Sequence, residues 1–197
     1  MKKCVYILRL IIIYIVAMII GTIKYDMDMF ADSKYFRGGG KWKKFTGIGW
    51  RWILEDYYGC KKLHVNQDVR FPVSPRIKIA HPENIVFDSD DIVNFQGFGN
   101  YYQAFGKIVI GSGSYIAPNV GLITANHDVN NLEEHSEAKE IHIGKNCWIG
   151  MNSMILPGVI LGDKTIVGAG SVVTKSFPLG NCVIGGNPAK IIKYLSE

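Results

Sequence analysis

The sequence has few cysteines and no spacing that would give them a common role. The four cysteines of the 197-residue chain lie far apart, with no CxxC pair and no cysteine–histidine cluster at zinc spacing. This pattern argues against a disulfide-stapled secreted domain, and four unpaired thiols fit a reducing compartment. The triplet Gly38-Gly39-Gly40 lacks the lysine of a Walker motif, so we interpret it as a flexible joint.

Positive charge is also missing from most of the chain. The net charge is +5, but residues 1–62 carry 12 Lys/Arg against 5 Asp/Glu, whereas residues 63–197 carry 10 against 12. A uniformly basic nucleic-acid-binding protein is therefore not expected. With 48% hydrophobic and 20% charged residues, a wholly disordered chain is excluded as well.

A long hydrophobic run occurs at the N-terminus, where 19 residues from Val5 to Ile23 contain a single charge, Arg9. As a helix this run would be about 28 Å long, close to the thickness of the hydrocarbon layer. No small-x-small cleavage site follows it, so a cleaved signal peptide is the weaker alternative. We predict a membrane-anchoring helix over residues 1–23, either spanning the bilayer or lying monotopically in one leaflet.

Residues 24–74 are expected to form a basic, aromatic juxtamembrane and capping segment. Residues 24–62 hold 10 of the 23 aromatic residues, a composition that suits the headgroup layer and anionic lipid. Single-stranded nucleic acid is the less favoured partner for such a mixture. The basic residues after Lys24 are Lys34, Arg37, Lys41, Lys43, Lys44, Arg51, Lys61 and Lys62. This basic flank predicts a cytoplasmic catalytic domain and, if the helix spans, an external N-terminus.

The rest of the chain carries an internal repeat of six residues. Large aliphatic residues recur every six positions, and mostly small residues follow each of them four positions later. An α-helix with 3.6 residues per turn could not keep such a stripe on one face. The aliphatic residues are Ile143, Ile149, Ile155, Leu161, Val167 and Val173.

Each hexad is interpreted as one short strand and one turn, so that three hexads complete one triangular coil. The aliphatic residue would fill the interior, the small residue a corner, and glycine would permit the turn geometry. The chain resembles the left-handed parallel β-helix of the hexapeptide-repeat acyltransferases. That resemblance implies a mainly β domain over residues 75–197 with one extruded loop and a short C-terminal helix.

The repeat is interrupted once, by a polar and mostly acidic stretch from Asn126 to Glu140. ITANHD, this stretch, IHIGKNCWIGMNSMILPGVILGDKTIVGAGSVVTKSFP and GGNPAKII occur in that order. Together they resemble the sugar O-acetyltransferases that modify bacterial capsule, exopolysaccharide and lipopolysaccharide.

The resemblance assigns His127 as the catalytic base that takes the proton of an acceptor hydroxyl. Candidate acceptor-binding residues are Asn100, Gln103 and Asn126. Asp128 is a candidate for orienting the imidazole, against the simpler interpretation of a solvated loop residue. The other histidines are interpreted as structural or solvated; they are His64, His81, His135 and His142.

The resemblance also places coenzyme A in a groove between neighbouring subunits of a homotrimer. The lysines among the donor-site positions would pair with its phosphates. A solvated charged face is the simpler interpretation of these lysines. The matched donor-site residues are Trp148, Met151, Gly168, Ala169, Thr174, Lys175, Lys190 and Lys193.

The resulting expectation is transfer of acetyl from acetyl-CoA to a sugar hydroxyl, without a metal, at the cytoplasmic face of the bacterial inner membrane. Three alternatives stay open at this point. The enzyme would be an N-acetyltransferase if the acceptor were an amino sugar. It would be a zinc carbonic anhydrase if His127, His135 and His142 shared a metal. Without catalysis, the chain would be a membrane-associated β-helix scaffold.

Overall fold

The computed structural model describes residues 2–30, 32–38 and 46–196, with side chains from residue 5 onward. Lys41, Trp42, Lys43 and Lys44 of the basic segment lie outside the described residues. The chain divides into two compact units, Met1–Pro75 and Arg76–Glu197, which we call the N-terminal unit and the repeat unit.

Among its described residues, the N-terminal unit contains the helices α1 (Lys2–Lys24) and α3 (Ile48–Leu63), with a 3-10 turn η1 (Met27–Met29) between them. The second half of α1 packs on α3, where the rings of Tyr14 and Trp50 meet edge to face at 4.8 Å. Ala17 is fully buried in this packing, and small side chains let two helices approach closely. α3 ends at His64, which adopts the left-handed conformation and thereby has a structural role.

α1 contains a stretch long and apolar enough to cross a membrane, Val5–Lys24, with a mean hydropathy of 2.4. Only 11% of its most apolar window is buried within the structure. This agrees with the expected N-terminal apolar helix. The exposed apolar side chains of α1 include Val5, Leu8, Ile12, Ile15, Ile19 and Ile23.

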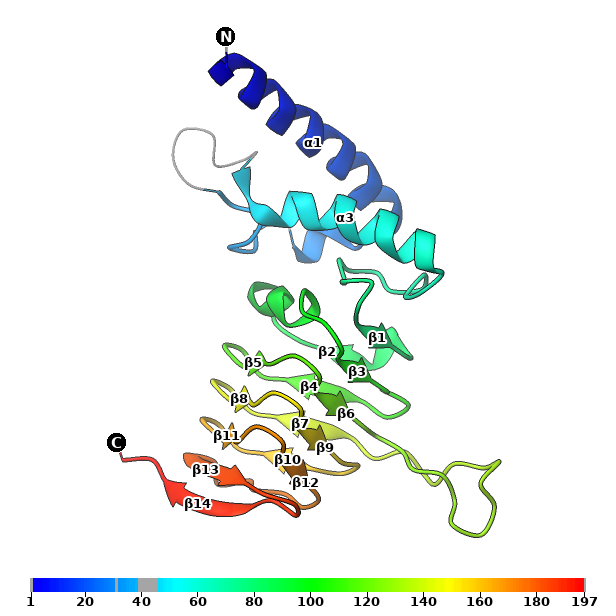
Figure 1. Ribbon diagram of the computed structural model, residues 1–197, viewed down its shortest axis with the longest axis vertical. Helices are drawn as coiled ribbons and strands as arrows, with labels where there is room; N and C mark the ends of the chain where they lie inside the picture. Colours follow the sequence, from blue (N-terminus) through cyan, green and yellow to red (C-terminus); the bar gives the residue numbers. More distant parts are fainter. Residues whose placement is uncertain (1, 31, 39–45, 197) are drawn as a thin grey trace. The chain divides into compact units, whose positions relative to one another are not determined.

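Three sheets form the faces of the repeat unit, and all their strand pairs are parallel except the pair that includes the last strand (Figure 1). Face A contains β1 (Lys78–Ile79), β3 (Tyr101–Tyr102), β6 (Gly121–Leu122), β9 (Met154–Ile155) and β12 (Val172–Val173). Face B contains β2 (Ile85–Val86), β4 (Ile108–Ile110), β7 (Ile141–Ile143) and β10 (Ile160–Leu161). Face C contains β5 (Tyr115–Ile116), β8 (Trp148–Ile149), β11 (Ile166–Val167), β13 (Cys182–Gly185) and β14 (Lys190–Tyr194).

The pairing of strands shows how many residues make up one circuit of the coil. Met154 pairs with Val172, and Trp148 with Ile166, so each partner lies three hexads further along the chain. Successive strands thus visit the three faces in turn, which is the arrangement of a parallel β-helix and is consistent with the left-handed form. Gly121 pairs with Met154, so the circuit between them is longer than three hexads by the length of the interruption in the repeat.

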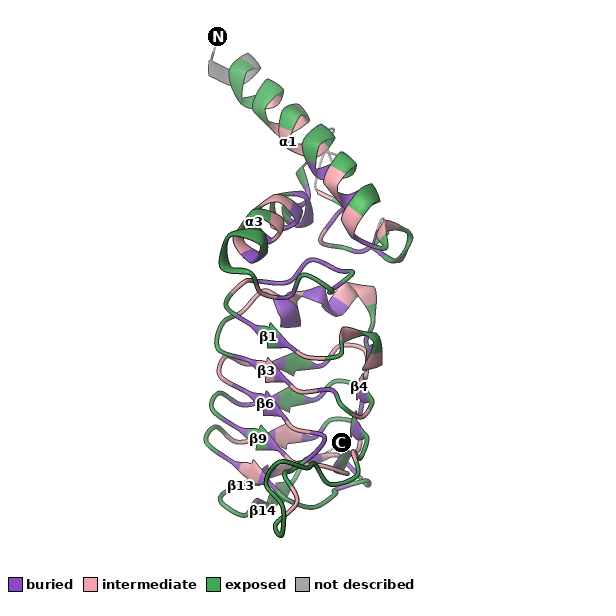
Figure 2. Ribbon diagram, turned by 90° about the vertical axis from the view of Figure 1, so that its right-hand side faces the viewer, coloured by how far each residue is buried: buried purple, intermediate pink, exposed green. Residues whose placement is uncertain are grey.

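The six periodic aliphatic residues are all buried, each with at most 1% of its surface exposed. The polar residues that follow four positions later are buried too and bond to the backbone, as when Ser153 Oγ donates to Gly168 O (3.1 Å). Figure 2 shows the buried positions recurring from coil to coil. The predicted interior of the β-helix is therefore confirmed.

Gly150 of the repeat has a role other than the one expected at the turns. A Cβ added to Gly150 would lie 2.6 Å from the backbone nitrogen of Ala169 in the next coil, so this glycine allows successive coils to stack. The left-handed turn conformation is adopted by other glycines, such as Gly170, and by asparagines such as Asn146 and Asn152. Asparagine tolerates that conformation better than most other residues with a side chain.

The predicted C-terminal helix is wrong. Residues 190–194 form strand β14, which turns back after Gly185 and pairs antiparallel with β13. The β-branched pair Ile191-Ile192 favours a strand, and β13 offers an open edge that supplies its hydrogen bonds.

At the other end of the repeat unit, the first coil is irregular, as expected, and includes the 3-10 turn η3 (Pro82–Asn84). A longer 3-10 segment, η4 (Ser89–Phe95), buries Ile92 and Phe95 completely against the coil. The rings of Phe95 and Tyr102 lie 5.4 Å apart. The capping role expected of residues 45–74 stays a prediction.

Candidate functional site

The interruption of the repeat lies between β6 and β7 and leaves the coil as a loop on the corner between faces A and B (Figure 1). We call this the loop corner. Hydrogen bonds close the base of the loop: Ser136 N–H donates to Asn126 O (2.8 Å), and Asn126 N–H donates to Ser136 Oγ (3.2 Å). Lys139 N–H donates to Thr124 O (2.7 Å), which returns the chain to the coil.

His127 is the first loop residue past this closure, and its side chain is exposed. Its Nδ1 lies 2.7 Å from the carbonyl oxygen of Leu132, in the same loop. A carbonyl oxygen can only accept, so Nδ1 carries the proton and Nε2 of the neutral ring keeps its lone pair. The loop contact therefore leaves Nε2 as the ring nitrogen that can accept a hydrogen bond.

A second histidine packs against this ring. His127 and His135 face each other across the loop as an isolated antiparallel pair, and their ring centroids lie 4.4 Å apart at an angle of 32°. His135 in turn meets the edge of Phe105 at 5.1 Å, and Phe105 meets His81 at the same distance. A row of four rings thus links the loop to the coils, which sequence reasoning missed because the loop has no periodicity.

Asp128 does not bond to His127 Nδ1, whose partner is the carbonyl oxygen of Leu132. Its Oδ1 accepts hydrogen bonds from the backbone N–H groups of Asn130 (2.7 Å) and Asn131 (3.3 Å). The carboxylate therefore shapes the loop turn, and the backbone carbonyl of Leu132 occupies the position of an orienting group.

A hollow of about 450 Å³ lies beside the loop base. It brings together two predicted site residues, Asn126 from the acceptor set and Thr174 from the donor set. The remaining lining residues are Ser136, Glu137, Lys139, Leu156 and Pro157. Ser136, Lys139 and Pro157 carried no signal in the sequence, because their approach depends on how the loop closes.

The side chains of the two other predicted acceptor residues form hydrogen bonds within the protein. Asn100 is 2% exposed; its Nδ2 donates to Tyr102 Oη (2.9 Å), and its Oδ1 accepts from Val120 N–H (3.2 Å). This burial argues against a contact between Asn100 and a sugar. Gln103 is half-buried, and its Oε1 accepts from the N–H groups of Thr124 (3.0 Å) and Ala125 (2.8 Å).

Four predicted donor residues lie on or beside a different corner, between faces C and A. Trp148 projects from β8 with 56% of its surface exposed, and Met151 is exposed in the turn that follows. Gly168 and Ala169 occupy the equivalent turn of the next coil, where Gly170 N–H donates to Met151 O (2.8 Å). We call this the glycine corner.

The three predicted phosphate-binding lysines gather at the last coil. Lys190 and Lys193 are exposed on β14, where they pair with Gly185 and Val183 of β13. Lys175 lines a hollow of about 260 Å³ that also contains Ile191 and Tyr194 of β14. Its ammonium group lies 5.8 Å from the ring centre of Phe177.

The predicted site residues are thus divided between two corners of the β-helix. Asn126, His127 and Thr174 lie on the loop corner, while Trp148 and Ala169 lie on face C and the glycine corner. Face A separates the two corners. In the described part of the chain, no three His, Cys, Asp or Glu side chains form a group that could hold a metal ion.

Comparison with known proteins agrees with this architecture. Residues 140–175 match the family described as bacterial transferase hexapeptide (six repeats). The chain is 31% identical over 192 residues to a protein of Escherichia coli (strain K12) provisionally named the colanic acid biosynthesis acetyltransferase WcaF, covering 87% of this chain and 98% of that one. It is 41% identical over 108 residues to the galactoside O-acetyltransferase of the same organism and spans 53% of that relative.

A solved galactoside acetyltransferase in complex with coenzyme A is similar in structure, with a TM-score of 0.53 and 28% identity. The match covers 63% of this chain and 61% of that one. The coil and the relatives together define an acyl-transferring enzyme built on hexapeptide repeats. The chain belongs to the hexapeptide-repeat acetyltransferase family, which confirms the resemblance drawn from its motifs.

Proposed function

We propose that the protein transfers acetyl from acetyl-CoA to a sugar hydroxyl of a cell-surface glycan or its precursor, with His127 as the general base. The observation that carries the proposal is the 2.7 Å contact between His127 Nδ1 and the Leu132 carbonyl, since it leaves Nε2 free to accept a proton. Named sugar acetyltransferases among the relatives support the choice of substrate class.

In the reaction, Nε2 takes the proton of the acceptor hydroxyl as its oxygen attacks the thioester carbonyl carbon. The carbon–sulfur bond then breaks, and the departing thiolate receives the proton from the imidazolium. Burial raises the pKa of both the Cys147 and the Cys182 thiols, so neither is suited to act as a thiolate nucleophile. Direct transfer follows as the simpler route.

For acceptor binding we propose Asn126, at the edge of the hollow, and Gln103, whose amide nitrogen is not used in holding Thr124 and Ala125. Asn100 is left out because it is buried. The donor would lie along Trp148, Met151, Gly168, Ala169 and Thr174. Its phosphates would pair with Lys175, Lys190 and Lys193, which share one end of the coil.

The division of these residues between two corners supports a homotrimer in which the loop corner of one subunit meets the glycine corner of the next. Exposed apolar side chains on the flat faces favour such packing; they include Tyr115, Trp148, Met154 and Ile160. Light scattering of the full chain in detergent should give three protein copies per particle. An active single copy would contradict the shared site.

Shared sites have a further test. His127→Ala and Ala169→Trp should each be inactive, because one removes the base and the other fills the donor path. When the two variants are dissociated and reassembled together, some interfaces combine an intact His127 with an intact Ala169, so part of the activity should return. No recovery in verified mixed particles would place both groups in a single subunit.

We further propose that α1 holds the enzyme at the cytoplasmic face of the bacterial inner membrane. The close packing of Ala17 and Tyr14 against α3 favours a shallow, monotopic position over a full span. A span would draw the exposed Arg51–Glu55 ion pair of α3 toward the hydrocarbon layer.

The orientation is tested with Val129→Cys in intact cells, using a membrane-impermeant thiol reagent. Val129 is 90% exposed in the loop, whereas Cys60, Cys147 and Cys182 are buried and give little background. With Cys4 replaced by serine, the loop thiol should stay unlabelled until lysis. Labelling before lysis would refute the cytoplasmic placement.

The activity itself is tested by incubating the purified full chain with acetyl-CoA and candidate sugars, followed by mass spectrometry of the products. Mild alkali distinguishes the products, because it cleaves an acetyl ester and leaves an acetamide intact. An alkali-labile product expected from a sugar alcohol supports O-acetylation. A stable acetamide from an amino sugar would replace this proposal by N-acetylation.

A further inference from the structure

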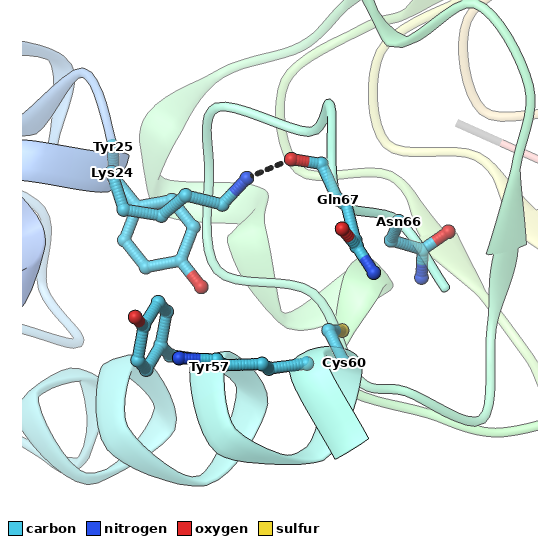
Figure 3. A pocket seen from close by; sticks show the side chains of 7 residues that line it. Lys24, Tyr25, Tyr57, Cys60, Asn66 and Gln67 are labelled. Carbon is cyan, nitrogen blue, oxygen red and sulfur yellow. Dashed lines mark hydrogen bonds between the residues drawn. The ribbon is translucent and has the colours of Figure 1, made fainter. Parts of the chain in front are cut away.

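The N-terminal unit contains a pocket of about 230 Å³ that the acetyl-transfer chemistry does not use (Figure 3). It lies between the last turn of α1, the side of α3 and the turn that follows α3. Its lining residues are Lys24, Tyr25, Tyr57, Cys60, Lys61, Asn66 and Gln67.

Two ammonium groups border this pocket. Lys24 donates to the backbone oxygen of Gln67, as Figure 3 shows, and an ammonium has two further N–H groups to offer. Lys61 lies 5.8 Å from the ring centre of Tyr57. Within the described ranges of the chain, neither lysine forms an ion pair with a carboxylate.

The other polar groups of the pocket are neutral. Burial, followed by the nearby Asp56 carboxylate, raises the pKa of Tyr25 above its usual range, so its hydroxyl stays protonated and can donate. The same two causes raise the pKa of Cys60 to about 11. Burial, followed by the nearby Arg70 guanidinium, lowers the pKa of Lys24, and the Asp68 carboxylate acts in the opposite direction. Arg70 is itself paired with Asp26 at 3.2 Å.

The place of the pocket on the chain indicates the kind of anion. Lys24 is the last residue of the apolar stretch Val5–Lys24 and thus marks the end of the part suited to hydrocarbon. Lipid phosphates lie at that depth, where tyrosine rings are also favoured. Tyr25 and Tyr57 supply two such rings at the pocket.

We propose that this pocket binds the phosphate of an anionic phospholipid headgroup between Lys24 and Lys61. The inference rests on the membrane anchoring proposed above and adds a defined lipid contact to it. Bound lipid would fix the end of α1 against α3, which orients the enzyme at the surface.

The probe is phosphatidylglycerol, with phosphatidylcholine as the zwitterionic reference, added to the full chain in neutral detergent. Native mass spectrometry counts the lipid retained. Two lysines near a headgroup should favour phosphatidylglycerol roughly tenfold or more. Lys24→Gln combined with Lys61→Gln should reduce this preference to about twofold or less.

Lys62→Gln is the matched control, since it removes the same charge from the next position of α3, outside the pocket. It should retain the preference of the unaltered chain. An equal loss in Lys62→Gln and Lys61→Gln would show general charge attraction and overturn the pocket. Lys61→Glu is a second variant, chosen because position 61 is exposed and the substitution is not expected to disturb folding. It should abolish the preference for phosphatidylglycerol.

Competition with soluble glycerol 1-phosphate distinguishes a site for a lipid phosphate from a site for a free phosphate ester. If it displaces phosphatidylglycerol at equal concentration, the pocket is a phosphate site and the lipid assignment is overturned. Loss of lipid preference with intact acetyl transfer would contradict this inference alone. Intact lipid preference without acetyl transfer would contradict the proposed function alone.

Discussion

The two units of the chain differ in how far they bury their apolar side chains. In the repeat unit, the periodic aliphatic residues are at most 1% exposed and face one another inside the coil. In the N-terminal unit, Ile15 and Ile19 of α1 are 50% and 56% exposed. The repeat unit therefore completes its own hydrophobic core, whereas α1 leaves much of its apolar surface exposed. The proposed chemistry and the proposed anchoring are separated along the same boundary.

The largest effect is expected from a single side chain of the repeat unit. His127→Ala should reduce turnover by roughly 10²–10⁴-fold, because the general base is lost. Its stability should hardly change, since the side chain is exposed. Steady-state kinetics and thermal unfolding of the same preparation measure both. His142→Ala, exposed on β7, is the control, and wild-type turnover in His127→Ala would contradict the mechanism.

The difference in burial between the two units is tested by making the same substitution, isoleucine to alanine, once in each unit. Ile155→Ala empties a fully buried position and should lower the free energy of unfolding by about 2–5 kcal/mol. Ile15→Ala, in detergent, should change it by about 0.5 kcal/mol or less. Denaturant unfolding followed by circular dichroism compares them. Equal losses would mean that α1 is packed like the coil and would break the comparison.

A smaller effect is expected at His135, whose ring supports that of His127. His135→Ala should lower kcat by about tenfold, because a poorly positioned base loses rate steeply. His135→Phe keeps a flat ring and should recover most of the loss, with KM unchanged in both variants. A phenylalanine variant as slow as the alanine variant would assign His135 a role beyond ring packing.

The smallest effect is expected at Asp128. Asp128→Asn keeps a side-chain oxygen that can accept from the N–H groups of Asn130 and Asn131, so kcat should stay within about twofold. The measurement is kcat over the full pH range in which the enzyme is stable. A large loss would show that Asp128 orients His127 and would reverse the assignment to the Leu132 carbonyl.

The sequence was sufficient to predict the coil because its period is a direct consequence of geometry. One residue in six must point inward, and Ile143 to Val173 follow that rule. The reason for the glycines was harder to predict. Close stacking at Gly150 depends on the backbone of Ala169 in the next coil, which a local pattern does not contain.

The site was predicted less completely than the fold. His127 was assigned from the family resemblance and Asn126 from its place beside it, and the roles of both stay predictions. Ser136 and His135 were missed because loop closure depends on contacts within an aperiodic segment. The burial of Asn100 was not anticipated, because its side chain bonds to Val120 of the next coil as well as to the nearby Tyr102.

The antiparallel strand β14 also affects how the protein behaves at high concentration. A stack of parallel coils ends in open strand edges that could recruit another molecule and grow into a fibre. On face C the last edge is taken by β14, which runs in the opposite direction and carries Lys190 and Lys193 in exposed positions. Charged lysines on an edge strand disfavour the addition of a further strand. The same two side chains that we propose for binding the donor thereby help to keep the β-helix finite.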